Sequence, residues 1–85
     1  MQLTILYFAR LREALGRGRE TVSAPAQVQT LGQLRDWLAS RGEPWSSAFK
    51  EIRPLRAALD QAVAPDDARL REGAEVAFFP PVTGG

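Results

Sequence analysis

The sequence contains no cysteine and no histidine. Without cysteine the chain can form no disulfide and offers no thiolate nucleophile, and without histidine it lacks the commonest general base and metal ligand. These two absences exclude Ser-His and Cys-His catalysis. Lys50 is the only lysine, so the chain is also a poor target for lysine-directed modification.

Long apolar runs are missing as well. No run approaches the roughly 18 apolar residues of a membrane-spanning helix, and the N-terminus has no charged segment followed by an apolar one. We therefore expect no membrane span, no signal peptide and a cytoplasmic protein. Eleven basic and ten acidic residues give a net charge of +1, which provides no field for nucleic acid or an anionic membrane.

The most distinctive stretch is the C-terminal one. Val76 to Phe79 suits a strand, and Pro80 and Pro81 end it because proline donates no amide hydrogen to a sheet. Residues 80–85 then form a tail that reaches roughly 20 Å at about 3.3 Å per residue. The β-branched Val82 and Thr83 favour extended backbone, and Gly84 and Gly85 have no Cβ. The pattern predicts a tail that inserts its carboxylate into a narrow site on another protein; a frayed chain end or an expression scar is the alternative.

The first half of the chain predicts two strands and two helices. Alternation favours a strand from Gln2 to Phe8, with Leu3, Ile5 and Tyr7 on one face and Leu6 and Phe8 on the other. A short helix is expected at Ala9 to Leu15 with Gly16 as its stop, followed by a strand at Glu20 to Ala24. The T-x-x-Q capping box predicts the main helix at Thr30 to Arg41, with Gly42 as its stop. Arg10, Arg12, Arg17 and Arg19 cluster on the first of these helices and the turn after it. We expect a solvated charged face there, and a phosphate or partner contact is the alternative.

The second half predicts three more strands. Gly42 to Arg53 is expected to be a loop with one helical turn at Ser46 to Lys50. Strands are expected at Leu55 to Leu59, Ala62 to Ala64 and Glu75 to Phe79, the first two joined by a turn at Asp60 and Gln61. The order favours an α+β fold in which a right-handed crossover places the last strand beside the first and parallel to it.

The apolar residues at the tail root then share a face. In that arrangement the last strand turns Ala77 and Phe79 to the face that the main helix leaves open, together with Leu6 and Phe8. We expect Leu6, Phe8 and Phe79 to form an apolar docking patch.

Three segments carry a resemblance to a known family. The ending F-F-P-P-V-T-G-G, the start L-T-I-L-Y-F-A-R-L-R-E and the approach E-G-A-E-V-A-F resemble the small subunits of molybdopterin synthase, the sulfur carriers of molybdenum cofactor biosynthesis. The resemblance covers essentially the whole chain. It implies a ubiquitin-like β-grasp fold with a mixed sheet, one main helix packed on one face, a domain at residues 1–79 and a free tail at 80–85.

The resemblance also implies a chemistry that is centred on Gly85. The carboxylate of the terminal glycine would be adenylated by an ATP-dependent, E1-like activating enzyme, converted to a thiocarboxylate with sulfur from a donor protein, and used inside the synthase large subunit. The chain would bind no cofactor or metal and would not be catalytic alone. Its implied partner-binding residues are Leu6, Phe8, Phe79, Pro80, Pro81, Val82, Thr83 and Gly84.

Two other functions fit a Gly-Gly ending. One is a related sulfur carrier for thiamine thiazole or another thiolated product, and the other is a ubiquitin-like protein modifier or a plain interaction domain. A metal site is a weaker alternative, because carboxylates that bracket a surface turn, here Asp66, Asp67, Glu72 and Glu75, are usually solvated.

Overall fold

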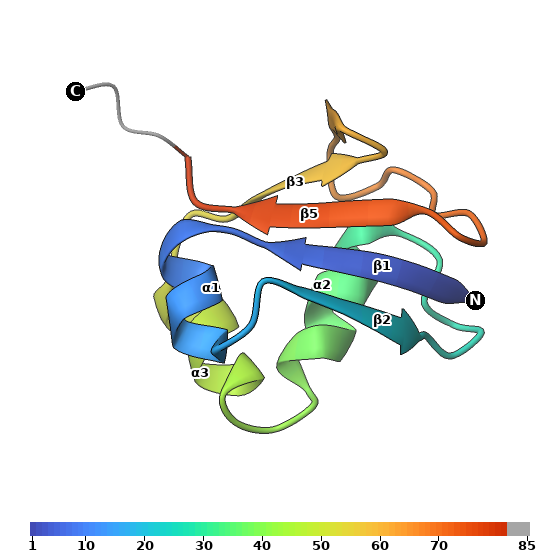
Figure 1. The fold of residues 1–85 in the computed structure, drawn as a ribbon. Helices are drawn as coiled ribbons and strands as arrows, with labels where there is room; N and C mark the ends of the chain where they lie inside the picture. Colours follow the sequence, from blue (N-terminus) through green and yellow to red (C-terminus); the bar gives the residue numbers. More distant parts are fainter. Residues whose placement is uncertain (82–85) are drawn as a thin grey trace.

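The structure, a computed structural model that describes residues 1–81, is an α+β fold in which helices cover one face of a mixed five-stranded sheet (Figure 1). The fold class predicted from the sequence is confirmed. In chain order the elements are β1 (Gln2–Tyr7), α1 (Ala9–Leu15), β2 (Arg19–Ser23), α2 (Leu31–Ala39), α3 (Trp45–Glu51), β3 (Arg56–Leu59), β4 (Ala62–Val63) and β5 (Glu75–Phe79).

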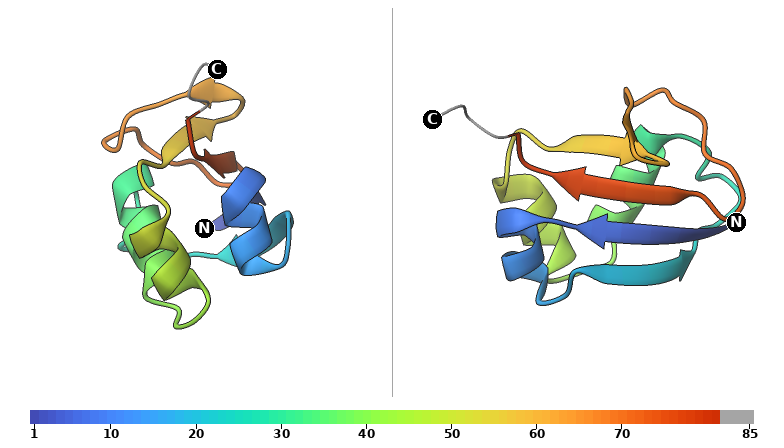
Figure 2. Two further views of the ribbon diagram at one scale, coloured as in Figure 1. Left: turned by 90° about the vertical axis from the view of Figure 1, so that its left-hand side faces the viewer. Right: turned by 45° about the horizontal axis from the view of Figure 1, so that its top comes forward.

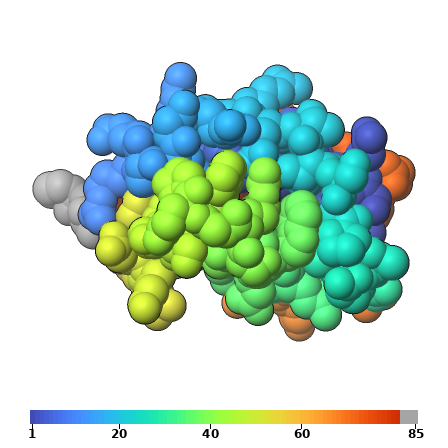
Figure 3. Space-filling view, turned by 90° about the horizontal axis from the view of Figure 1, so that it is seen from below, coloured from blue at the N-terminus to red at the C-terminus, as the bar shows by residue number. Residues whose placement is uncertain are grey.

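The sheet has the strand order β2-β1-β5-β3-β4. β1 pairs with β5 in parallel, and every other pair is antiparallel, so the last strand lies beside the first as the sequence order predicts. Figure 2 shows the strands side by side with the helices on one side only. Seen from the helix side, α1, α2 and α3 cover this face (Figure 3). β5 is therefore the middle strand, and the chain leaves the sheet from its centre.

The core lies between the sheet and the helices. The inward residues of β1 and β5, such as Ile5 and Phe78, are completely buried, and each large apolar side chain removed from water contributes about 1.5–3 kcal/mol. From α2 the core receives Leu31, Leu34 and Leu38, each with no exposed surface, as the spacing of these leucines predicts.

An aromatic cluster joins the sheet to α3. The Phe49 ring lies edge-on to Tyr7 and Phe78, at centroid distances of 6.5 and 5.5 Å. These are favourable edge-to-face arrangements. The helical turn expected at Ser46 to Lys50 is confirmed, but it is part of a longer helix, α3, than the expected loop allowed. α3 packs Ala48 and Phe49 into the core.

The N-terminus of α3 has a cap that the sequence pattern did not reveal. The Glu43 carboxylate accepts hydrogen bonds from the Ser47 backbone N–H at 3.0 Å and from the Ser47 hydroxyl at 2.6 Å. These hydrogen bonds, first the one from the hydroxyl, lower the pKa of Glu43. A carboxylate at a helix N-terminus satisfies an otherwise unpaired N–H group.

The main helix is shorter than its pattern predicts. The capping box of Thr30 and Gln33 is present, but α2 ends at Ala39 and not at Arg41. The Ser40 N–H group is shared between the carbonyl oxygens of Asp36 and Trp37, both at 3.1 Å, which tightens the last turn and ends the helix before Gly42. Arg41 is thus free to turn away from the helix axis toward β2.

Several strand boundaries differ by one or two residues from the predicted ones. β3 begins at Arg56 and not at Leu55, because the residue that would follow Phe79 in the ladder is Pro80, which has no N–H group. β1 ends at Tyr7, since Phe8 is the N-cap residue of α1. β2 covers Arg19–Ser23, one residue earlier than expected, and β4 is limited to Ala62–Val63.

Candidate functional site: the tail root and the open face of the sheet

The tail root is the end of β5, where Phe79 is followed by Pro80 and Pro81. All three residues are half-buried. Phe8 is held next to this root because its backbone N–H donates a hydrogen bond of 3.2 Å to the Phe78 carbonyl oxygen. The chain therefore leaves the middle of the sheet beside an aromatic side chain from the neighbouring strand.

The face of the sheet that the helices leave open carries an apolar row across four strands. In the registers of the sheet Leu6 lies beside Ala77, Ala77 beside Ala58, and Ala58 beside Val63. Cross-strand neighbours point to the same face, so these four side chains line up from β1 to β4. Sequence reasoning missed Ala58 and Val63, because β4 is only two residues long and gives almost no alternation to read.

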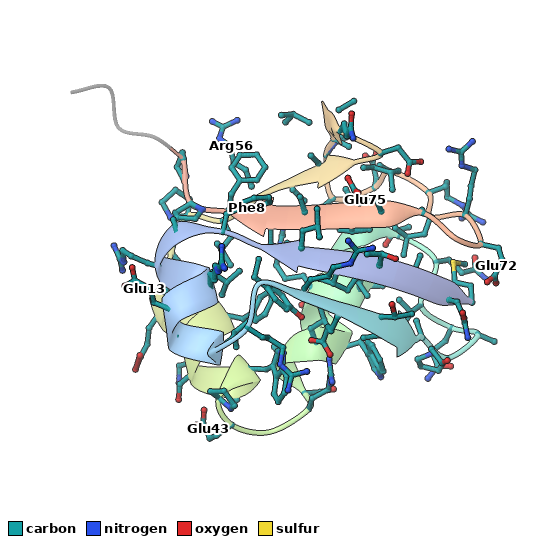
Figure 4. The ribbon with its side chains drawn as sticks, in the orientation of Figure 1. Phe8, Glu13, Glu43, Arg56, Glu72 and Glu75 are labelled. Atoms are coloured by element: carbon teal, nitrogen blue, oxygen red, sulfur yellow. The ribbon has the colours of Figure 1, made fainter. Side chains whose placement is uncertain are left out.

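Phe8 and Phe79 extend this row toward the tail root. Phe8 is one of two large apolar side chains that are classed as exposed among residues 1–81, at 46%, and the other is Val63, at 66%. Figure 4 places Phe8 on the side of the sheet away from the helices. We call this surface the apolar patch and define it as Leu6, Phe8, Ala58, Val63, Ala77 and Phe79.

The structure thus brings together the three patch residues that the sequence singled out, Leu6, Phe8 and Phe79. Their role in binding a partner stays a prediction. The remaining candidates, Val82, Thr83, Gly84 and Gly85, lie outside the described residues.

A second cluster lies under the sheet at β2 and was not found from the sequence. The Glu20 side chain is only 8% exposed and accepts a 2.6 Å hydrogen bond from the Tyr7 hydroxyl. The Arg41 guanidinium binds both Glu20 oxygens at 3.1 Å and lies over the rings of Trp37 and Trp45, with centroid distances of 5.5 and 4.3 Å. A bidentate, stacked arginine of this kind fixes the segment between α2 and α3 against the edge strand.

The protonation of this cluster follows from its contacts. Burial and then the hydrogen bond to Glu20 raise the pKa of Tyr7, so its hydroxyl stays a donor. Burial alone would raise the pKa of Glu20 too, but the hydrogen bonds from Arg41 and Tyr7 and the charges of Arg41 and Arg17 outweigh it and lower the pKa. At neutral pH the cluster therefore holds a carboxylate, a neutral phenol and a guanidinium.

Comparison with known proteins decides the family. A model of the ThiS family matches residues 5–85. This chain belongs to the ThiS family. Two curated relatives, both named molybdopterin synthase sulfur carrier subunit, are 39% identical (Escherichia coli) and 35% identical (Haemophilus influenzae); each alignment covers 98% of this chain and 99% of the relative. The resemblance drawn from the sequence is confirmed.

Solved structures agree on the fold of this ThiS-family chain. A putative molybdopterin converting factor subunit 1 from Pyrococcus furiosus has a TM-score of 0.79 at 24% identity and covers 96% of this chain and 99% of its own. A chain in the protein-protein complex of subunits 1 and 2 of the molybdopterin-converting factor from Helicobacter pylori has a TM-score of 0.67 at 19% identity, with 100% of both chains covered. At these identities the likeness shows the fold alone.

Two of the four carboxylates that could have suggested a metal site make structural contacts in this ThiS-family domain. Asp66 pairs with Arg35 at 2.8 Å, and Glu72 accepts a hydrogen bond of 2.9 Å from the backbone N–H of Gln2. Within residues 1–81 no group of three histidine, cysteine or acidic side chains is arranged to hold a metal ion. Over the same residues, no helix is both long and apolar enough to cross a membrane.

Proposed function

We propose that this ThiS-family chain is the sulfur carrier subunit of molybdopterin synthase. The observation that carries the proposal is the 35–39% identity, over nearly the whole length of both chains, to curated relatives of that name. The geometry of the tail root supports it, because a proline-stiffened exit from the centre of the sheet beside an apolar patch suits a domain that docks by its open face and extends its tail into a partner.

The reacting group in this proposal is the carboxylate of Gly85. A carboxylate is a poor electrophile, because its charge is delocalised and its leaving group would be oxide. Attack of a Gly85 oxygen on the α-phosphorus of ATP expels pyrophosphate and forms an acyl-adenylate. A sulfide equivalent then attacks the acyl carbon and AMP leaves, which produces a thiocarboxylate. The thiocarboxylate sulfur attacks an electrophilic carbon of the pterin precursor, and hydrolysis of the acyl–sulfur bond leaves the sulfur on the precursor and restores the Gly85 carboxylate.

In this scheme the other tail residues allow the Gly85 carboxylate to enter a narrow site on a partner. Val82 and Thr83 keep the backbone extended, and Gly84 and Gly85 keep the tip narrow because they have no Cβ. The chain supplies neither cysteine nor histidine, so acid-base groups, the ATP site and the sulfur source belong to its partners. These partners are the synthase large subunit, an E1-like adenylyltransferase and a sulfur donor protein, and the proposed compartment is the cytoplasm.

Intact-mass measurement tests the proposal directly. The full chain is incubated with the activating enzyme, ATP and a sulfur source, and we expect a mass gain equal to the replacement of one oxygen by one sulfur, located at Gly85 by fragmentation. Reactions without ATP, and with a variant that lacks Gly84 and Gly85, serve as controls. A chain that keeps its mass in the complete reaction would rule out the proposed chemistry.

A pull-down distinguishes the product. Recovery of the molybdopterin synthase large subunit, and formation of molybdopterin when that subunit and the precursor are added, support the proposal. Recovery of a thiazole synthase instead would assign the chain to thiamine synthesis. Isopeptide conjugates on target lysines would indicate a protein modifier.

A further inference from the structure

The net charge of +1 hides a strong separation of charge along the chain. Residues 1–56 carry nine basic and five acidic side chains, whereas residues 57–85 carry two basic and five acidic ones. This asymmetry gives the protein surface a basic side and an acidic side if the basic and acidic residues also lie apart in the folded domain.

The registers of the sheet place two arginines on either side of the apolar patch. Arg19 of β2 lies beside Leu6, and Arg56 of β3 lies beside Phe79. Since cross-strand neighbours share a face, both guanidinium groups belong to the open face and flank the patch. Figure 4 shows Arg56 together with Phe8 at the end of the sheet where β5 stops.

Two further arginines lie at the same end of the molecule. Arg10 is in the first turn of α1, two residues after Phe8, and Arg53 precedes the start of β3. We call these four residues, Arg10, Arg19, Arg53 and Arg56, the arginine collar. All four are exposed, and none makes an ion pair with another residue of the described range 1–81.

The opposite end of the sheet is acidic. Glu75 begins β5, and Asp60 lies beside it, because its backbone N–H donates to the Glu75 carbonyl oxygen at 2.8 Å. Asp60 also pairs with Arg71 at 2.7 Å, and Glu72 lies farther out in the same region (Figure 4). Asp66 does not belong to this group, because it pairs with Arg35 of α2. The open face therefore runs from basic at the tail root to acidic at the far end, with the apolar row between.

We propose that the arginine collar is a docking element for the synthase large subunit, and that the large subunit presents carboxylates on the surface that covers the collar. This inference rests on the proposed function and adds the chemistry of the contact. An apolar row alone would allow the sheet face to dock in either direction along the strands. The collar at one end and the acids at the other favour the single orientation that directs the tail into the partner.

The collar is suited to steering because its charges are not paired within the domain. Unpaired exposed charges act over about a Debye length, roughly 10 Å at 0.1 M salt, and raise the association rate by 10-fold or more when the partner is complementary. The effect belongs mainly to kon and falls with ionic strength, whereas loss of the apolar patch acts mainly on koff.

The test measures association of the full chain with the isolated large subunit by stopped flow at several salt concentrations. We expect the double variant Arg19→Glu with Arg56→Glu to lower kon about tenfold or more at low salt and to flatten its salt dependence. The matched control is Arg69→Glu with Arg71→Glu, which changes the net charge equally at the acidic end and is expected to leave kon nearly unchanged. Replacing Arg19 and Arg56 by lysine keeps the charge and should preserve kon.

Several outcomes would overturn the inference. Equal losses in the collar variant and the control would show a net-charge effect without a site, and a loss in the lysine variant would show that charge is not what is recognised. A change in self-association of the chain, without a change in binding to the large subunit, would assign the collar to contacts between copies. If the collar variant binds normally and still becomes thiocarboxylated and yields molybdopterin, the inference fails while the proposed function stands. If the wild-type chain neither binds the large subunit nor accepts sulfur, both the inference and the proposed function fail.

Discussion

The Tyr7 hydroxyl donates a 2.6 Å hydrogen bond to the Glu20 carboxylate, which joins the interior strand β1 to the edge strand β2 beneath the sheet. Because Tyr7 is fully buried and Glu20 nearly so, the bond replaces contacts with water that neither group could otherwise keep. The same carboxylate holds Arg41 in a bidentate pair. This relationship connects the tail-bearing half of the sheet to the segment that leads into α3.

Replacing Tyr7 by Phe should therefore lower stability without changing the fold. The ring keeps its edge-on contact with Phe49, while Glu20 loses one of its hydrogen bonds. A hydrogen bond to a charged group contributes about 1.5–3 kcal/mol, so we expect the free energy of unfolding to fall by about 2 kcal/mol in urea titrations. A variant as stable as the wild type would mean that this hydrogen bond makes no net contribution to the free energy of unfolding.

The ion pair of Glu20 also predicts a pH dependence. The folded-state pKa of Glu20 lies below its ordinary value of 4.5, so the folded state binds fewer protons than the unfolded state in acid. The stabilisation is fully present above pH 4.5 and is lost as the pH falls through the folded pKa. Glu20→Gln should be less stable than the wild type at neutral pH, and the difference in the free energy of unfolding should narrow as the pH falls below 4.5.

Comparison of these two proteins isolates Glu20 from other acids. Glu43 and Asp60 also have lowered pKa values, so the wild type alone would lose stability in acid for several reasons. These contributions are common to both proteins and cancel in the difference. A constant gap between neutral and acidic pH would contradict the assignment.

Short-range sequence patterns correctly predicted the strands, helix ends and turns that depend on residues close together in the chain. The alternation of Leu3, Ile5 and Tyr7 identified β1, and the pair Thr30 and Gln33 identified the start of α2. The turn at Asp60 and Gln61 was also predicted, and both residues have the positive φ that a two-residue hairpin needs.

The parts that were missed depend on contacts between distant residues. Arg41 and Glu20 are 21 residues apart in the sequence, and no short-range spacing predicts such an ion pair. α3 forms because Phe49 packs on Tyr7 and Phe78, which only the assembled sheet can provide. At the candidate site, alternation placed Phe79 on the open face, whereas Val63 needed the register between β3 and β4.

Removing Gly84 and Gly85 should separate folding from function. The core consists of residues between Leu3 and Phe78, so we expect an unchanged thermal midpoint for the shortened chain. Sulfur transfer should be abolished, because the proposed acyl carbon and its narrow approach are gone. The measurement pairs thermal unfolding with molybdopterin formation, and product formed at the wild-type rate would exclude Gly85 as the sulfur-bearing residue.

Replacing Phe79 by Asp tests the apolar patch. Phe79 is half-buried at the tail root and pairs with Arg56 in the register of β3 and β5. A partner that docks there would cover it completely. A buried aromatic at the centre of an interface costs about 2 kcal/mol or more when it is removed, so we expect the Kd for the large subunit to rise about 30-fold or more by calorimetry.

The variant Val63→Asp is the matched control for Phe79→Asp, because Val63 is equally apolar and more exposed but lies on the edge strand β4, away from the tail. If the partner covers only the tail root, this change should leave the Kd within about threefold, since rim positions contribute little. If both variants weaken binding alike, the interface extends along the whole apolar row from Leu6 to Val63. If Phe79→Asp binds as tightly as the wild type while Val63→Asp does not, the partner occupies the β4 side of the open face, and the tail would have to reach its site from there.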